Sequence, residues 1–140
     1  MTLGWKKALR AAVLTLGLYS AAPTEAEYLH IQLKVYGLDC EICARGVSAS
    51  VGRMEGVENI GVSLKTGRLE ISLKRGNMFK MSDLRKRIKE NGFRAMEAKV
   101  TAIGSYSGSK FYVLGAGESY NIGNPATKDS PPAEVTFDVK

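Results

Sequence analysis

Apolar and polar residues alternate along residues 28–36, where His30, Gln32 and Lys34 occupy the polar positions. The apolar positions of this run are Leu29, Ile31, Leu33 and Val35. An alternation of period two predicts a β-strand with one buried face and one face open to solvent. Gly37 interrupts the pattern, so we expect the strand to end there.

The period changes after Glu41, where apolar residues recur every three or four positions, as they do in an amphipathic helix. These residues are Ala44, Val47, Val51 and Met54. Asp39 belongs to the residue types that cap helix N-termini, and Gly56 follows the last periodic residue, where a helix stop is expected. We therefore predict a helix between these two residues.

Alternation returns in two further runs, which Lys-Thr-Gly at residues 65–67 separates. The apolar positions are Ile60, Val62 and Leu64 in the first run and Leu69, Ile71 and Leu73 in the second. Two alternating runs joined by a short turn that contains Gly predict a β-hairpin over residues 57–74.

A second helix is predicted after Arg-Gly-Asn at residues 75–77, which interrupts the alternation. Ser82 is a suitable N-cap, and Asn91 with Gly92 marks the C-terminal end. The apolar stripe of this helix consists of Leu84 and Ile88, with Met81 just before it. A fourth strand follows, with Met96, Ala98, Val100 and Ala102 on its apolar side.

The predicted order over about 75 residues is strand, helix, strand, strand, helix, strand, which is typical of a ferredoxin-like βαββαβ sandwich of the α+β class. Both helices cover one face of an antiparallel sheet in this arrangement, because all the apolar stripes are then buried in one layer. Methionines 54, 78, 81 and 96 fall at or near core positions, where filling gaps is their expected role.

Residues 104–140 differ in composition, being rich in Gly and Ser and then in Pro. Short apolar pieces within them predict two or three short strands, which we expect to pack against or beside the main domain, on the open sheet face or as part of a small barrel. The apolar residues are Phe111, Val113, Leu114, Ile122, Val135 and Phe137, more than a disordered segment usually has. We therefore predict a small C-terminal β extension that leaves residues 37–43 uncovered.

The first 26 residues have the layout of a secretory signal peptide. Lys6, Lys7 and Arg10 precede an uncharged, mostly apolar run at residues 11–22, and small residues follow up to Ala26. The apolar run is shorter than the roughly 20 residues that span a bilayer. We expect cleavage after Ala26 and an exported protein that makes no membrane contact once the leader is removed. The expected domains are therefore 1–26 as signal peptide, 27–103 as the βαββαβ domain and 104–140 as the extension.

Charge adds little to this interpretation. Residues 27–140 carry 17 Lys and Arg against 13 Asp and Glu, a mildly basic balance. The basic run at residues 84–89, Leu-Arg-Lys-Arg-Ile-Lys, is interpreted as the solvated face of the second helix. Since an exported protein rarely meets nucleic acid, no nucleic-acid partner is expected. The chain also lacks the motifs of the common hydrolases and phosphate-binding enzymes, so we do not expect an enzyme.

The chemistry lies in residues 37–43, Gly-Leu-Asp-Cys-Glu-Ile-Cys, which contain both cysteines of the chain. The predicted elements place Cys40 in the loop after the first strand and Cys43 in the first turn of the first helix. A helix N-terminus favours thiolate over thiol, and thiolate is the form that binds metal. Two thiolates on one exposed point suit Cu(I) or Hg(II). Zn(II) or Cd(II) would need further ligands, such as Asp39 or Glu41, and is the second choice.

With this loop in this position, residues 28–103 resemble a heavy-metal-associated domain. That family includes copper chaperones, a periplasmic mercuric-ion carrier and domains of metal-translocating P-type ATPases, and its usual loop reads Gly-Met-Thr/Asp-Cys-x-x-Cys. The resemblance implies that Cys40 and Cys43 are the two metal ligands, with Asp39 as a possible accessory. It also implies that Leu38 replaces the Met that packs under the loop, and that Phe93 takes the place of an aromatic residue near the metal.

The expected function is therefore that of a periplasmic carrier that chelates one soft metal ion and passes it on by thiolate exchange. Its partners would be a metal transporter or another metal-binding protein. Two alternatives remain open on the same residues: a thiol–disulfide redox protein, and an interaction module in which residues 104–140 bind a partner. His30, the single histidine, faces away from the core and is a weak candidate ligand.

Overall fold

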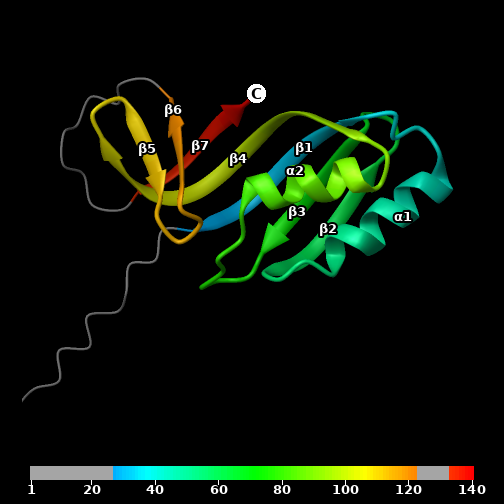
Figure 1. Ribbon diagram of the computed structural model, residues 1–140, viewed down its shortest axis with the longest axis horizontal. Coiled ribbons are helices and arrows are strands. Elements are labelled where there is room, and N and C mark those ends of the chain that lie inside the picture. The colour runs from blue at the N-terminus through cyan, green and yellow to red at the C-terminus, as the bar shows by residue number, and fades with distance from the viewer. Residues whose placement is uncertain (1–26, 123–132) are drawn as a thin grey trace, which may run out of the picture.

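The computed structural model describes residues 27–122 and 133–140, so the predicted signal peptide and part of the predicted extension lie outside the described residues. The elements follow the expected order and then continue beyond it (Figure 1). They are β1 (Tyr28–Tyr36), α1 (Glu41–Gly52), β2 (Val57–Ser63), β3 (Arg68–Leu73), α2 (Met81–Glu90), β4 (Arg94–Ser107), β5 (Lys110–Val113), β6 (Glu118–Asn121) and β7 (Ala133–Val139).

The first four strands form an antiparallel sheet in the order β2-β3-β1-β4, with both helices on one face (Figure 1). The predicted α+β, ferredoxin-like fold is thus confirmed. The register places Ile31 opposite Ile71 on one side and opposite Val100 on the other, so the predicted apolar stripes meet on one face. No helix in the described part of the chain is both long enough and apolar enough to cross a membrane.

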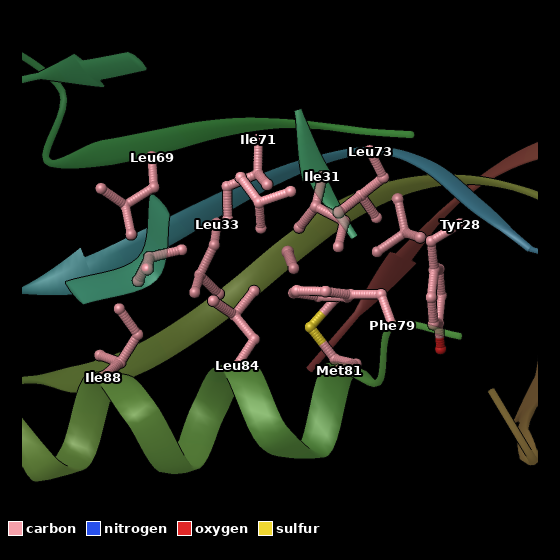
Figure 2. Packing of buried hydrophobic residues seen from close by; sticks show 14 of the residues in the cluster. Tyr28, Ile31, Leu33, Leu69, Ile71, Leu73, Phe79, Met81, Leu84 and Ile88 are labelled. Carbon is pink, nitrogen blue, oxygen red and sulfur yellow. The ribbon is translucent and has the colours of Figure 1, made fainter. Parts of the chain in front are cut away.

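The core lies between this sheet face and the helices (Figure 2). Leu33, Leu69, Leu84 and Ile88 are all fully buried, which joins the stripes of β1, β3 and α2. Not every predicted core position is buried. The side chain of Met78 is 77% exposed because it precedes α2 in the connecting segment, and Leu64 lies in the β2–β3 turn, past the end of its strand.

Both predicted N-caps were wrong. Cys40, and not Asp39, is the N-cap of α1, since its extended backbone leads into Glu41 and its own sulfur accepts the hydrogen bond of the cap. The N-cap position of α2 is Lys80, whose side chain makes no capping hydrogen bond. Ser82 already lies inside the helix. The C-terminal end of α2 is as predicted, with Asn91 as the C-cap, whereas α1 stops at Gly52, earlier than Gly56 suggested.

The predicted extension forms strands, and they lie beside the main domain. β4 continues to Ser107, past the expected boundary at residue 103, and pairs with β7 along its other edge. β5 and β6 form a hairpin that continues from the end of β4. Of the two placements expected for the extension, the open sheet face does not hold for this hairpin, because Glu118 of β6 contacts the first turn of α2 on the helix-bearing face.

Aromatic contacts hold the β5–β6 hairpin against the helix-bearing face of the sheet. Phe137 of β7 pairs with Val100 in the register and is buried on the core face. The ring of Phe111 in β5 packs edge-on against Phe137, with ring centroids 5.4 Å apart. At Gly104 the hairpin passes so close that an added Cβ would lie 2.3 Å from the carbonyl oxygen of Tyr112. β4 is longer than the helices, so the hairpin covers the part of its core face that they leave bare.

Glu118 of β6 supplies the missing cap of α2. Its carboxylate accepts hydrogen bonds from the backbone N–H groups of Met81 and Ser82, each at 2.9 Å. It also accepts one from the Tyr28 hydroxyl at 2.5 Å and one from the Tyr120 hydroxyl at 3.2 Å. Helix N-termini carry unpaired N–H groups and partial positive charge, so a carboxylate from a distant strand satisfies both. We refer to Glu118, Tyr28 and Tyr120 as the hairpin latch.

Candidate metal centre

The loop between β1 and α1 is shaped by the residues on either side of its cysteines. Gly37 has a φ of +87°, a conformation that a residue with a side chain adopts only with strain. Leu38 is only 2% exposed and packs beneath the loop, as the resemblance implied. The ring of Phe93 lies beside the loop, since it would stand 3.6 Å from a Cβ added at Gly37. The side chain of Leu38 therefore anchors the loop in the core, and the ring of Phe93 packs beside Gly37.

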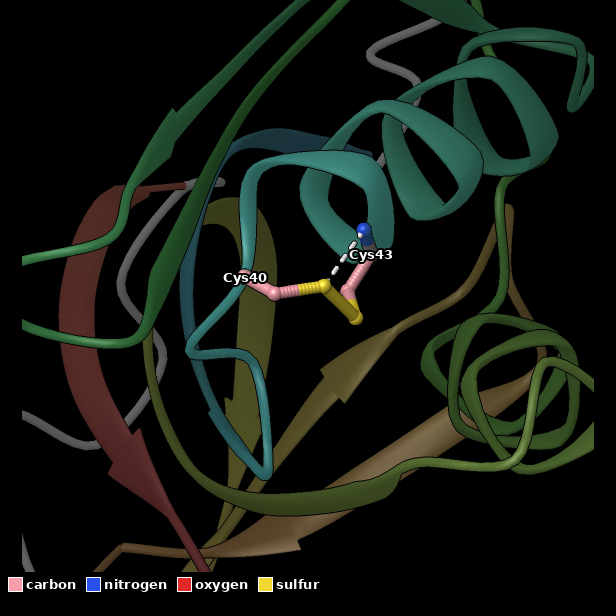
Figure 3. The surroundings of a disulfide bond; sticks show 2 residues. All are labelled: Cys40 and Cys43. Atoms are coloured by element: carbon pink, nitrogen blue, oxygen red, sulfur yellow. Dashed lines mark hydrogen bonds between the residues drawn. A yellow bond between two sulfur atoms is a disulfide. The ribbon is translucent and has the colours of Figure 1, made fainter.

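Cys40 and Cys43 stand at the very start of α1, and they are joined by a disulfide bond with their Cα atoms 5.2 Å apart (Figure 3). The Cys40 sulfur also accepts a hydrogen bond from the backbone N–H of Cys43 at 3.0 Å. This capping role was missed by sequence reasoning, which gave preference to Asp39 because Asp is a far commoner N-cap. The helix N-terminus thus donates a backbone N–H to sulfur, an arrangement that stabilises negative charge there.

The pair is accessible from solvent. Cys40 is exposed and Cys43 is partly buried against the core. Ile42, between them, is 84% exposed, and Glu41 makes an i, i+4 ion pair with Arg45 on the outer side of the helix. The hairpin latch contacts the first turn of α2, whereas the loop between β1 and α1 adjoins the other end of that helix through Phe93. The described part of the extension therefore leaves the cysteines uncovered.

Few other ligands surround the two sulfurs. Among residues 27–122 and 133–140, no group of three or more His, Cys, Asp or Glu side chains is arranged to hold a metal ion. Asp39 and Glu41 are both exposed. His30 lies on the open sheet face, where it pairs with Ser72 on one side and Thr101 on the other. The described residues therefore present a two-sulfur site without a third protein ligand in place.

Arg94, the first residue of β4, places a positive charge over Tyr36, which ends β1 before the cysteine loop. The guanidinium of Arg94 lies over the ring of Tyr36, 5.1 Å from its centroid, in a cation–π contact. Tyr36 is 67% exposed and ends β1 just before the loop. The surface next to the cysteines thus presents an aromatic ring, an exposed Ile and a cation, which are features of protein-binding surfaces.

Residues 32–94 match the family of the heavy-metal-associated domain. The chain is 30% identical over 61 residues to the copper chaperone CopZ of Bacillus subtilis (strain 168), covering 87% of that protein and 44% of this chain. This relative is a carrier and not an enzyme, in agreement with the expectation from the sequence.

Solved structures of similar proteins cover the same part of the chain. One is the copper-binding domain of a P-type ATPase, at 29% identity and a TM-score of 0.45, covering 49% of this chain and 90% of that one. Another is oxidised MerP of Ralstonia metallidurans CH34, at 20% identity and a TM-score of 0.45, covering 49% of this chain and 94% of that one. Because the chain is 30% identical to the copper chaperone over 87% of that protein's length, and residues 32–94 match the family model, it belongs to the heavy-metal-associated domain family.

Proposed function

We propose that this protein is a periplasmic carrier that binds one soft metal ion through Cys40 and Cys43 and passes it on by thiolate exchange. The observation that carries the proposal is the position of the two sulfurs, which lie together in an exposed loop at the N-terminus of α1. Exchange needs a partner's thiolates to reach the bound ion. An exposed pair on a firmly packed loop allows that approach while keeping the two sulfurs within reach of one ion.

The number of ligands favours Cu(I) or Hg(II) as the cargo. These soft ions accept two thiolates, whereas Zn(II) and Cd(II) bind more ligands than the described residues bring to the loop. Asp39 is the residue that would be recruited for a third bond, because it directly precedes Cys40. The relationship to a copper chaperone favours copper between the two soft ions.

The disulfide bond makes the redox state part of this function. A disulfide sulfur has no thiolate charge, so the ion can bind only after the bond between Cys40 and Cys43 has been reduced. A carrier in an oxidising compartment therefore depends on a reducing partner, or on metal that arrives before the thiols are oxidised. The partners that this function requires are a metal transporter or a second metal-binding protein.

The direct test is metal titration of the reduced protein with Cu(I), Hg(II) and Zn(II) in the presence of competing chelators. We expect one equivalent of Cu(I) or Hg(II), and no binding by a variant with Cys40→Ser and Cys43→Ser. That variant should stay folded, because Cys40 is exposed and Cys43 is only partly buried. A matched control is Ser48→Ala in the same helix. Unchanged binding by the double variant would place the site elsewhere in the chain.

The disulfide also supports a second candidate function, that of a thiol–disulfide redox protein. The two functions are separated by trapping the thiols of intact cells with an alkylating agent before mass spectrometry. A carrier should show reduced or metal-protected cysteines when cells are fed with copper. Cysteines that remain fully oxidised in metal-fed cells, and whose disulfide oxidises a second protein's dithiol in vitro while being reduced itself, would support the redox function in place of the carrier.

A further inference from the structure

The positive charge of the chain is concentrated on one surface. Residues 53–55 and 74–90 together carry eight Lys and Arg against three Asp and Glu, a net charge of +5. Residues 27–140 as a whole carry a net charge of only +4, so the remainder of the protein is close to neutral. These residues form the C-terminal end of α1, the segment before α2 and α2 itself. We refer to them as the basic end.

A hollow of about 370 Å³ lies within the basic end, between the end of α1, the segment before α2 and one side of α2. Its apolar lining includes Met54 and Phe79, which are largely buried, and the strongly exposed Met78. Arg53, Lys80 and Lys86 also line it. A cavity with an apolar base and a cationic rim matches an amphiphile that has a negatively charged head.

Three cations of this rim are available to an outside partner. Arg53, Lys80 and Lys86 are exposed, and none of them forms an ion pair with a described residue. The carboxylates that also line the hollow are Glu55, Asp83 and Glu90. Glu90 is paired with Arg87, and Asp83 lies in the first turn of α2, where the helix dipole favours a negative charge. The lining thus holds four Lys and Arg against three Asp and Glu, and the basic end as a whole carries a net charge of +5, so this surface keeps an excess of positive charge.

Met78 adds an apolar contact at the same place. Its side chain is 77% exposed and stands between Arg75 and Lys80 in the sequence, so it has little packing role in the fold. An exposed apolar side chain among cations is the arrangement by which peripheral proteins insert into the interface of an anionic membrane. A solvated helix face explains the cations of α2, but it does not explain an exposed Met or an apolar hollow beside them.

We propose that the basic end docks on a bilayer that contains anionic phospholipid, with headgroup phosphates against Arg53, Lys80 and Lys86 and with Met78 inserted between the lipids. This replaces the expectation that the protein makes no membrane contact after export. The cysteines begin α1 and the hollow lies at its end, about 18 Å further along a helix of 12 residues. A docked protein would therefore hold its metal loop away from the lipid headgroups, free to meet the thiolates of a membrane-bound partner.

The test is binding of the protein that begins at Glu27 to vesicles of phosphatidylglycerol and phosphatidylcholine, measured by co-sedimentation at low and physiological salt. We expect binding that weakens with salt and is lost on vesicles of phosphatidylcholine alone. The double variant Lys80→Glu and Lys86→Glu should bind at least about tenfold more weakly. Met78→Ser should weaken binding about fivefold or more, without changing the salt dependence.

The control is the double variant Lys65→Glu and Lys99→Glu, which changes the net charge by the same amount in the β2–β3 turn and on β4. If the basic end contacts the membrane, this control should bind vesicles within about twofold of the wild type. Any of three results with vesicles would overturn the proposal: no preference for anionic vesicles, equal losses in the two double variants, or full binding by Met78→Ser. Equally tight binding to DNA at the same salt would also overturn it, in favour of a general polyanion site. The variant lacking both cysteines should bind vesicles normally, which separates this surface from the metal function.

Discussion

Replacing Glu118 by Gln tests how far the extension is built into the domain. The carboxylate accepts four hydrogen bonds, from two hydroxyls and from two backbone N–H groups of α2. One of its oxygens accepts only from Ser82. A Gln side chain is expected to place its NH2 group at the position of this oxygen. The variant then loses the hydrogen bond from the Ser82 N–H and brings two donors face to face. It also removes the negative charge from the N-terminus of α2.

The expected loss follows from the strength of such bonds. A hydrogen bond to a charged group contributes about 1.5–3 kcal/mol, and a carboxylate near a helix N-terminus about 0.3–1 kcal/mol. We therefore expect Glu118→Gln to lower the free energy of unfolding by about 2 kcal/mol at pH 7. Glu118→Ala should cost about 3 kcal/mol or more, because it also leaves the buried hydroxyl of Tyr28 with only Tyr120 as a partner.

The pH dependence of this loss has a definite sign. Burial alone raises the pKa of Glu118, but the hydrogen bonds from Tyr28 and from the N–H groups of Ser82 and Met81 outweigh it and hold this pKa below its usual value. A depressed carboxyl pKa contributes stability above the unfolded-state pKa, and that contribution is lost as the pH falls through the folded-state value. The difference between wild type and Glu118→Gln should thus be full at pH 7 and shrink below about pH 4.

Urea unfolding followed by circular dichroism, repeated between pH 3 and pH 7, measures both effects. Glu134→Gln is the matched control, because Glu134 is an exposed carboxylate on β7, and its change should stay within about 0.5 kcal/mol. The latch would be refuted if Glu118→Gln unfolded within that margin of the wild type at pH 7. A difference that grew on acidification would refute the assignment of the charged form.

Three further predictions concern the packing of the extension and of the α2 segment. Gly104→Ala should destabilise the fold by about 2 kcal/mol or more in the same urea assay, because the added Cβ would meet the backbone of Tyr112. The control Gly46→Ala, whose Cβ would lie in open space on α1, should stabilise the fold by about 0.5–1 kcal/mol. Equal effects of the two substitutions would contradict this packing. Asn77→Ala should cost about 2–4 kcal/mol, because this buried amide makes three hydrogen bonds to backbone groups, and a loss under 1 kcal/mol would show that water replaces them. Limited proteolysis should leave residues 104–122 intact. A chain that ends at Ser107 should be less stable, because Phe111 no longer covers the core. Rapid trimming to about residue 103 with unchanged stability would show that the extension is a tail.

The sequence alone determined the βαββαβ domain and the place of its cysteines. Period-two and period-3.6 patterns are local, so the stripes of Leu33 and Leu84 defined their elements without knowledge of any partner. The strand that ends at Gly37 and the helical period that begins after Glu41 were likewise sufficient to place the cysteine pair at a helix N-terminus. The burial of Leu38 was anticipated through the family's loop pattern, because that pattern already encodes the packing under the loop.

Only the tertiary structure decided how the extension attaches and how both helices are capped. A capping side chain can come from any part of the chain, and the cap of α2 comes from Glu118, which lies 36 residues away from Ser82. The hairpin covers part of the helix-bearing face because β4 extends beyond the helices. This placement depends on the relative lengths of the elements and on the close approach of β5 to Gly104. Likewise, the cationic hollow beside the exposed Met78 is formed by residues just after α1 and along α2, which come together only in the folded protein.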